Sequence, residues 1–353
     1  MALTGSRGGR SDRVHRLTRI ALLIMSTAGF VLVAGLLAYY GAADVLGALA
    51  ATGWGVLLVT AFHLVPMALD TLAWAALLPP GQRPAFGRLL AMRWVGESVN
   101  ALVPSAQVGG DLVRAHLLTR AGLPGADAAV SVIVNLTLMV IALFAFSLAG
   151  AVALVIYLRP AGAALLLPAL MLFAVAFAAT FVATQRAGVF GAIVRLASRC
   201  LPARDFSTLL AGAGRLDDGL RHAWANYRRV GASTAWALAG WCAGSGEIWL
   251  AMLLLGQPVT LVEAFILESL IQAVRNGAFF VPGALGIQEG GAVLLGGLFG
   301  IAPESALALS LLKRARELLL GLPGLLAWQA WSGMRLLPAR REATATASSA
   351  EGQ

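Results

Sequence analysis

Two stretches of this sequence interrupt its apolar pattern in the same way: NALVPSAQVGGD at residues 100–111 and RNGAFFVPGALGIQEGG at residues 275–291. Each contains Val-Pro, a small residue, Ala and a later Gly-Gly pair, and each leads to a proline at an expected helix start, Pro124 and Pro303. The gap from Pro to Gly-Gly differs by three residues. We therefore predict an internal repeat. Paired broken segments are typical of transporter binding sites, because irregular backbone at membrane depth must be buried or line a cavity.

The composition around these motifs predicts a membrane protein. Of the 353 residues, 59% are apolar and only 12% are charged, whereas soluble domains are about 45–50% apolar and about 25% charged. The mean hydropathy is +0.81. We predict an all-α polytopic membrane protein with about six full spans. Two broken or re-entrant helical segments, formed by the motifs, are added to these spans as an inverted repeat.

Basic residues predict the orientation, since cytoplasmic loops of membrane proteins are enriched in Lys and Arg. We expect a basic cytoplasmic tail at 1–19, a single transmembrane domain at 20–333 and a disordered cytoplasmic tail at 334–353 in the bacterial inner membrane. Residues 186–229 carry eight arginines and an amphipathic pattern. They are expected on the cytoplasmic side, either as a helix in the head-group region or as a helix packed on other loops.

The expected spans follow from the apolar runs. They lie at about residues 20–40, 54–78, 126–157, 162–184, 230–255 and 318–331. The first run exceeds the apolar core of about 7–15 residues in a signal peptide, so we expect it to be uncleaved. Pro66 is expected to kink the second span. The last span is short, and it leaves Lys313 to Arg316 outside or in the membrane, against the charge rule.

Charged residues flank both motifs, and an ionisable group within a membrane is a functional candidate because its insertion costs about 2.5–3.5 kcal/mol. Arginine matches a phosphate through its planar fork of donors, and glycine amides at helix starts bind anions. The candidate substrate-binding residues are Glu97, Asn100, Pro104, Gly109, Gly110, Asp111, Arg114, Arg275, Asn276, Pro282, Gly283 and Glu289. The alternative is that both motifs are interfacial loops with solvated charges. Asp70 and Glu247 are either functional groups within the membrane or groups that face a polar interior.

Other function classes find no support in the sequence. The four histidines lack metal-ligand spacing, and no nucleotide-binding loop or activated nucleophile is present, so we expect no metal, no cofactor and no enzymatic activity. The net charge of +9 lies in tails and loops beside apolar runs rather than in a nucleic-acid-binding module. The expected partners of the protein are therefore membrane lipids rather than nucleic acid.

The two motifs resemble the flippase-like transmembrane domain of the lysylphosphatidylglycerol synthase family. The resemblance rests on Asn100-x3-Pro104, Gly109-Gly110-Asp111-x2-Arg114 and Phe280-Val-Pro-Gly283-x2-Gly286-x2-Glu289-Gly290, and it extends over about residues 15–335. The second motif is also similar to the hopanoid-cluster-associated membrane proteins of this superfamily. The resemblance implies a bacterial inner-membrane domain that moves modified or polyprenyl-type lipids between leaflets. Few polar residues follow the last expected span, so we expect a stand-alone form without the aminoacyl-transfer domain.

The leading hypothesis is a lipid translocase or lipid-handling transporter. An anionic phospholipid or a polycyclic lipid would place its head group in a polar cavity lined by both motifs, and Arg114 and Arg275 would meet an anionic head group. The alternative is a non-transporting partner of lipid biosynthesis enzymes, for example those of hopanoids. In that case the basic segment 186–229 would be the docking surface.

Overall fold

The computed structural model describes residues 52–103, 109–158, 207–278, 281 and 284–333, with isolated positions at 43, 47, 50, 168, 172, 176, 179, 180 and 183. The tails, the expected first span, nearly all of the expected fourth span and the first part of the basic segment lie outside these residues. Within them, every regular element is a helix. The prediction of an all-α fold is therefore confirmed.

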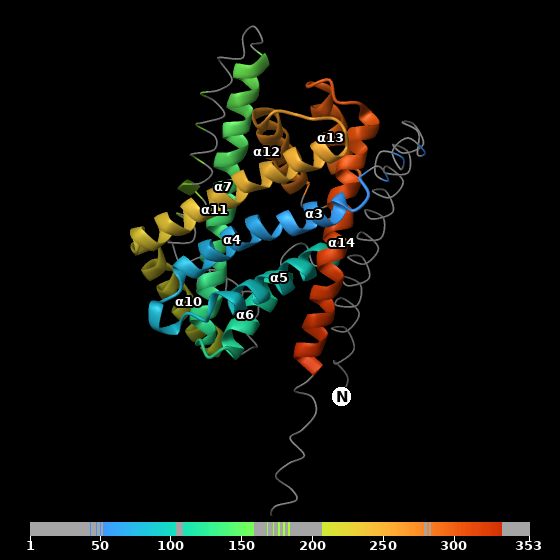
Figure 1. Cartoon of the computed structure of the whole chain (residues 1–353). Coiled ribbons are helices and arrows are strands. Elements are labelled where there is room, and N and C mark those ends of the chain that lie inside the picture. Colours follow the sequence, from blue (N-terminus) through green and yellow to red (C-terminus); the bar gives the residue numbers. More distant parts are fainter. Residues whose placement is uncertain are drawn as a thin grey trace, which may run out of the picture.

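Figure 1 shows the helices of the described residues. They are α3 (Gly55–Phe62), α4 (Leu64–Leu77), the 3₁₀ turn η1 (Pro80–Gln82), α5 (Phe86–Leu102), α6 (Gly109–Arg120), α7 (Gly125–Leu158), α10 (Ser207–Ala225), α11 (Tyr227–Leu254), α12 (Leu261–Gly277), α13 (Ile287–Gly297) and α14 (Pro303–Gly333). Three stretches of the described chain are long and apolar enough to cross a membrane: Gly55–Leu77, Gly125–Leu158 and Tyr227–Leu254. These three agree with the spans expected at 54–78, 126–157 and 230–255.

The first of these stretches is broken into α3 and α4 at His63, three residues before Pro66. Proline has no N–H, so the carbonyl of Phe62 loses the partner that an unbroken helix would provide, and the helix is interrupted one turn before the proline. The backbone N–H of His63 still donates to Val59 at 3.1 Å, and that of Met67 donates to His63 at 3.2 Å. A titratable side chain thus lies at the break itself.

The order of the described elements is similar in the two halves of the chain. In each half a leading helix, α4 or α11, precedes a second helix, a broken motif, a short helix and a long helix, which are α5–α6–α7 in the first half and α12–α13–α14 in the second. Contacts between the halves are made crosswise: α4 packs on α11, α5 on α14 and α12 on α7. Figure 1 shows α7 and α14 running in opposite directions. These opposite directions are those expected of an inverted repeat, which stays a prediction.

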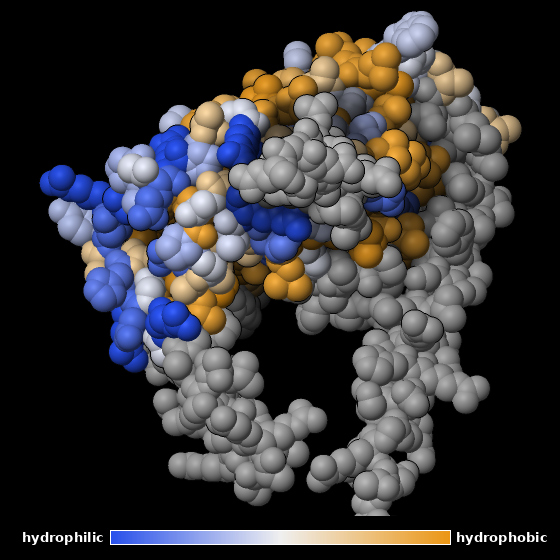
Figure 2. All heavy atoms as spheres, turned by 90° about the horizontal axis from the view of Figure 1, so that it is seen from below, coloured by the Kyte–Doolittle hydropathy of each residue, from blue (hydrophilic) through white to orange (hydrophobic). Residues whose placement is uncertain are grey.

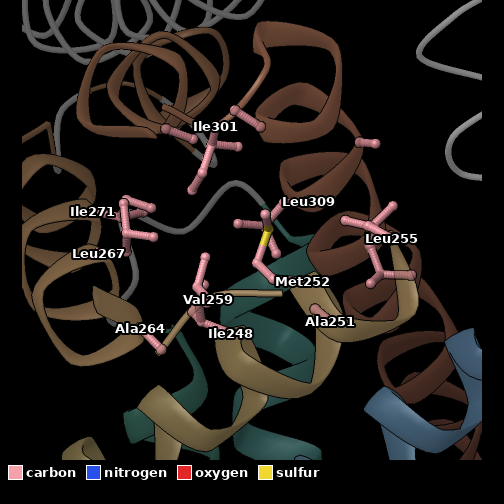
Figure 3. Packing of buried hydrophobic residues seen from close by; sticks show 14 of the residues in the cluster. Ile248, Ala251, Met252, Leu255, Val259, Ala264, Leu267, Ile271, Ile301 and Leu309 are labelled. Carbon is pink, nitrogen blue, oxygen red and sulfur yellow. The ribbon is translucent and has the colours of Figure 1, made fainter. Parts of the chain in front are cut away.

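Small residues allow the helices to approach closely. A Cβ atom on Gly110 of α6 would collide with the backbone carbonyl of Gly96 in α5, and one on Gly150 of α7 would collide with Ser269 of α12. Such contacts bring backbones together, as small residues do in membrane helix interfaces. The main apolar cluster joins α11, α12 and α14 through fully buried side chains such as Ile248, Leu267 and Leu312, and Figure 3 shows how residues of this cluster point toward one another.

The final helix differs from the sequence prediction. α14 begins at Pro303 rather than near Leu318, and with 31 residues it is about 46 Å long. Lys313 and Arg316 therefore lie within the helix, only 3% and 7% exposed, and not in a loop. The hydropathy pattern failed here because these cations are compensated by carboxylates of other helices, which a scan of apolar runs does not detect.

The described part of the basic segment is amphipathic, as predicted, and its apolar face is covered by protein. Leu220 and Trp224 of α10 are buried in a cluster with Val130, Val134 and Leu138 of α7. Figure 2 shows hydrophilic residues gathered on one side of the molecule, the side where α10 and η1 lie in Figure 1. This packing favours the alternative of a helix docked on the protein over a helix with its apolar face in lipid.

Candidate functional site

A polar cavity of about 330 Å³ lies among the helices that the crosswise contacts bring together. Side chains of α4, α5, α11, α12 and α14 line it, with contributions from the α3–α4 break and from α7. Its ionisable lining residues are His63, Asp70, Arg93, Glu97, Glu247, Glu268, Arg275, Arg316 and Glu317. Ionisable groups are rare within membrane helices and mark functional sites when they gather around a cavity.

One charged cluster lies on the α4–α5 side of the cavity. Arg93 donates from Nη2 to Asp70 Oδ2 at 2.8 Å and from Nε to Glu97 Oε1 at 2.7 Å. The other Asp70 carboxylate oxygen is buried without a hydrogen-bond partner among the described residues and lies against Gly240 of α11. Glu97 is the most accessible of the three, with 35% of its side chain exposed. The cluster contains two carboxylates for one guanidinium.

A second cluster joins the α3–α4 break to α11 and α14. Glu247 of α11 contacts Arg316 of α14 through Oε1, and its Oε2 lies 2.8 Å from His63 Nδ1. The same His63 nitrogen lies 2.8 Å from Arg316 Nη1. Glu247 is 2% exposed, so its charge is stabilised by these partners rather than by water.

The remaining charges of the cavity pair α12 with α14. Arg275 contacts Glu317 at 2.7 Å, and Lys313 Nζ donates to Glu268 Oε2 at 2.6 Å. Gln272 donates to the other oxygen of Glu268 at 2.7 Å. Every arginine that lines the cavity therefore contacts a carboxylate. The structure holds these cations in fixed positions, each with its charge already compensated.

Three of the predicted site residues line the cavity: Glu97, Asn100 and Arg275. Asn100 also accepts a hydrogen bond through Oδ1 from the backbone N–H of Gly110, at 2.7 Å. This bond links the end of α5 to the start of α6 across the first broken motif. Pro104, Pro282 and Gly283 lie outside the described residues.

Arg114 and Asp111 lie behind the cavity rather than in its wall. Arg114 donates to Asp111 at 3.0 Å and to Asn135 of α7 at 2.8 Å, and its guanidinium lies 4.2 Å from the ring centre of Trp74. It is 6% exposed. The expectation that Arg114 meets a head group directly is not supported in this conformation, because both of its terminal nitrogens and its flat face contact protein partners and its Nε is buried. It holds α6 against α4 and α7.

The glycine pairs and Glu289 also have partners of their own. Gly109 begins α6, and the backbone N–H of Gly110 is bound to Asn100, while that of Gly290 donates to Gly286 at 2.9 Å. These two amides are not available to an anion. Glu289 accepts from the backbone N–H of Gly286 at 2.7 Å and from Arg314 at 3.2 Å, so it caps α13 and ties it to α14. Asn276 donates to the carbonyl of Gln272 and stays within its own helix.

Sequence reasoning missed most of the cavity wall. Arg93, Arg316 and Glu317 were not among the candidate site residues, and all three line the cavity. Sequence reasoning noted Asp70 and Glu247 only as groups within spans, and the structure brings both to the cavity. The signal that could have found Arg93 is its spacing from Glu97, four residues apart on one helix.

Comparison with known proteins identifies the family. A family model described as the lysylphosphatidylglycerol synthase TM region matches residues 20–324. The chain belongs to this family. The match contains both broken motifs and all the lining residues of the cavity, so the resemblance seen in the motifs is confirmed for the membrane domain. Membership gives the chain a lipid-related function in a membrane. No curated protein and no solved structure was found to match the chain.

Proposed function

We propose that this chain moves a lipid between the two leaflets of the membrane, with the lipid head group bound in the polar cavity. The observation that carries this proposal is a cavity walled by charged side chains within a bundle whose outer surface is apolar. Large apolar side chains are exposed on several helices, among them Leu58, Leu253, Leu294 and Leu326. Such a surface suits acyl chains, whereas the cavity offers a polar head group an alternative to water.

The charges of the cavity favour a head group that contains a cationic centre. Five carboxylates line it, against three arginines, and Lys313 compensates Glu268 from behind the wall. Arg314 contacts Glu317 at 3.3 Å as well, but Glu289 balances its charge at 3.2 Å. With His63 neutral, one negative charge of the cavity therefore remains uncompensated among these described residues. An anionic head group would have to displace a carboxylate from an arginine, and an amine would instead meet the excess charge near Asp70 and Glu97. A lysylphosphatidylglycerol-like lipid contains amines, which the carboxylates of the cavity would attract, and a phosphate, which its arginines would attract.

A leaflet-exchange assay tests the proposal. The purified chain is reconstituted into liposomes that contain lysylphosphatidylglycerol, and a membrane-impermeant amine reagent measures how fast inner-leaflet lipid becomes accessible. We expect exchange by the wild type, and Glu97→Gln should slow it by about tenfold, the effect of about 1.4 kcal/mol in the interaction with the cation.

Asp218→Asn is the matched control, since Asp218 is exposed on α10 and pairs only with Arg221 at 3.5 Å in the described structure. It should exchange lipid like the wild type. If the exchange rates of the wild type and of Glu97→Gln equalled that of protein-free liposomes, the transport proposal would be wrong. That result would favour the alternative, a non-transporting partner of lipid biosynthesis enzymes. Equal slowing in both variants would contradict a role for the cavity.

A further inference from the structure

His63 occupies a position in which a hydrogen on its Nδ1 atom decides which neighbour it binds. Its Nδ1 atom lies 2.8 Å from a carboxylate oxygen of Glu247 and 2.8 Å from a guanidinium nitrogen of Arg316. An imidazole nitrogen donates when it carries a proton and accepts when it does not. It cannot satisfy both neighbours at once.

The two states have different consequences for the helices. When Nδ1 is unprotonated and Nε2 carries the hydrogen, Nδ1 accepts from Arg316, and His63 is attached to α14. When a proton binds to the Nδ1 lone pair, the resulting imidazolium donates to Glu247 of α11 and repels Arg316. Because His63 interrupts α3–α4, this exchange of partners acts at a break in the backbone and not within a rigid helix.

The surroundings of His63 define its charge environment. Facing the cavity with it are Asp70 from α4, Arg93 and Glu97 from α5, Glu247 from α11, Glu268 and Arg275 from α12, and Arg316 and Glu317 from α14. Lys313 lies behind Glu268. The group of Glu247, Arg316, Glu317 and Arg275 is balanced, so the uncompensated negative charge belongs to Asp70, Arg93 and Glu97. A proton on His63 would balance it across the same cavity.

We infer that His63 is a proton-binding site whose proton and the cationic centre of the lipid head group compete for the single uncompensated negative charge of the cavity, so that transport exchanges one for the other. The inference rests on the proposed function. When the cation binds, the Nδ1 proton leaves to water and His63 accepts from Arg316. When the cation leaves, a proton from water returns to Nδ1, and the charge of the site is the same at both stages.

One-for-one exchange has a thermodynamic signature that does not depend on rate. A pH difference of about one unit across the membrane should maintain about a tenfold leaflet ratio of a lipid with one net positive charge, enriched on the acidic side. Proteoliposomes with labelled lysylphosphatidylglycerol, one pH unit more acidic inside, are followed until the leaflet ratio is steady. We expect about tenfold enrichment of the inner leaflet with wild type and none in protein-free vesicles.

His63→Gln should reduce the steady ratio toward one, because glutamine hydrogen-bonds but does not titrate. His116→Gln is the control, since His116 is exposed on α6 outside the cavity, and it should keep the wild-type ratio. Exchange by the wild type with no pH-dependent ratio would overturn this inference and leave the proposed function standing. Absence of any exchange would overturn the proposed function. A tenfold ratio in His63→Gln would show that the proton binds elsewhere.

A second measurement decides the matter if His63→Gln is inactive or unfolded. The chain contains four histidines, so the variant with His15→Gln, His116→Gln and His222→Gln retains His63 alone. Nitrogen NMR of its ring in micelles reports whether Nδ1 carries a proton. At a fixed pH, we expect added lysylphosphatidylglycerol to reduce the fraction of His63 rings that carry a proton on Nδ1. No change in the ring signals on lipid binding would overturn the inference.

Discussion

The ion pair between Lys313 and Glu268 offers a direct test of how the charges of this bundle are held. The pair joins α14 to α12 at 2.6 Å, and the two side chains are 4% and 5% exposed. Removing one partner of a buried pair leaves an unpaired charge and costs about 3–5 kcal/mol, whereas replacing both partners with uncharged groups of similar size is close to neutral. Lys313→Met and Glu268→Gln should therefore each destabilise the fold by about 3–5 kcal/mol.

The double variant should lie within about 1 kcal/mol of the wild type, because both buried charges are gone. Glutamine at position 268 also keeps an oxygen for the hydrogen bond from Gln272, which is 2.7 Å long in the wild type. Unfolding by SDS in mixed micelles, followed by intrinsic fluorescence, measures the three free energies. The exposed pair Asp218–Arg221 serves as control, since neutralising it should cost no more than about 1 kcal/mol.

Two results would refute this reasoning. If each single variant lost less than about 1 kcal/mol, the two charges would be solvated through the cavity and not buried. If the double variant were as unstable as the single ones, the loss would come from packing around the side chains and not from the unpaired charge. Helix content by circular dichroism should be unchanged in all three variants, so that the free energies compare the same fold.

Three further substitutions test other parts of the structure. Gly110→Ala should prevent α6 from packing on α5, because the added Cβ collides with the carbonyl of Gly96, and size-exclusion chromatography should show loss of the folded species. Trp224→Ala should cost about 3–5 kcal/mol in SDS unfolding, since this side chain is 6% exposed and packs α10 on α7. Arg114→Lys should lower stability by about 1–3 kcal/mol in the same assay, because lysine cannot bridge Asp111 and Asn135 through two nitrogens.

The sequence predicted the architecture well where its signals are local. Length and hydropathy located α7 and α11 within a few residues. Pro124 and Pro303 correctly predicted the starts of α7 and α14. The repeat was visible because proline and glycine impose the same backbone interruption wherever they occur. The crosswise packing of α5 on α14 was not predictable, since nothing local indicates which helix of the other half a given helix meets.

The site was predicted only in part, for a related physical reason. Residues beside the motifs stood out because glycine and proline mark them, yet much of the cavity wall comes from residues outside the motifs, such as Arg93 on α5, Asp70 on α4 and Glu247 on α11. Their importance depends on partners that lie 23 to 253 residues apart in sequence. A charged residue in an apolar helix indicates that a partner exists, and only the fold shows which one.

The distribution of charge along the chain has a consequence for how the protein is made. α14 is synthesised after the other described helices, and it supplies the cations for acids synthesised earlier: Arg316 for Glu247, Lys313 for Glu268 and Arg314 for Glu289. Until that helix enters the bilayer, these carboxylates have no countercharge from it and must remain in contact with water or take up protons. The earlier helices can therefore reach their final charge state only after α14 has been synthesised.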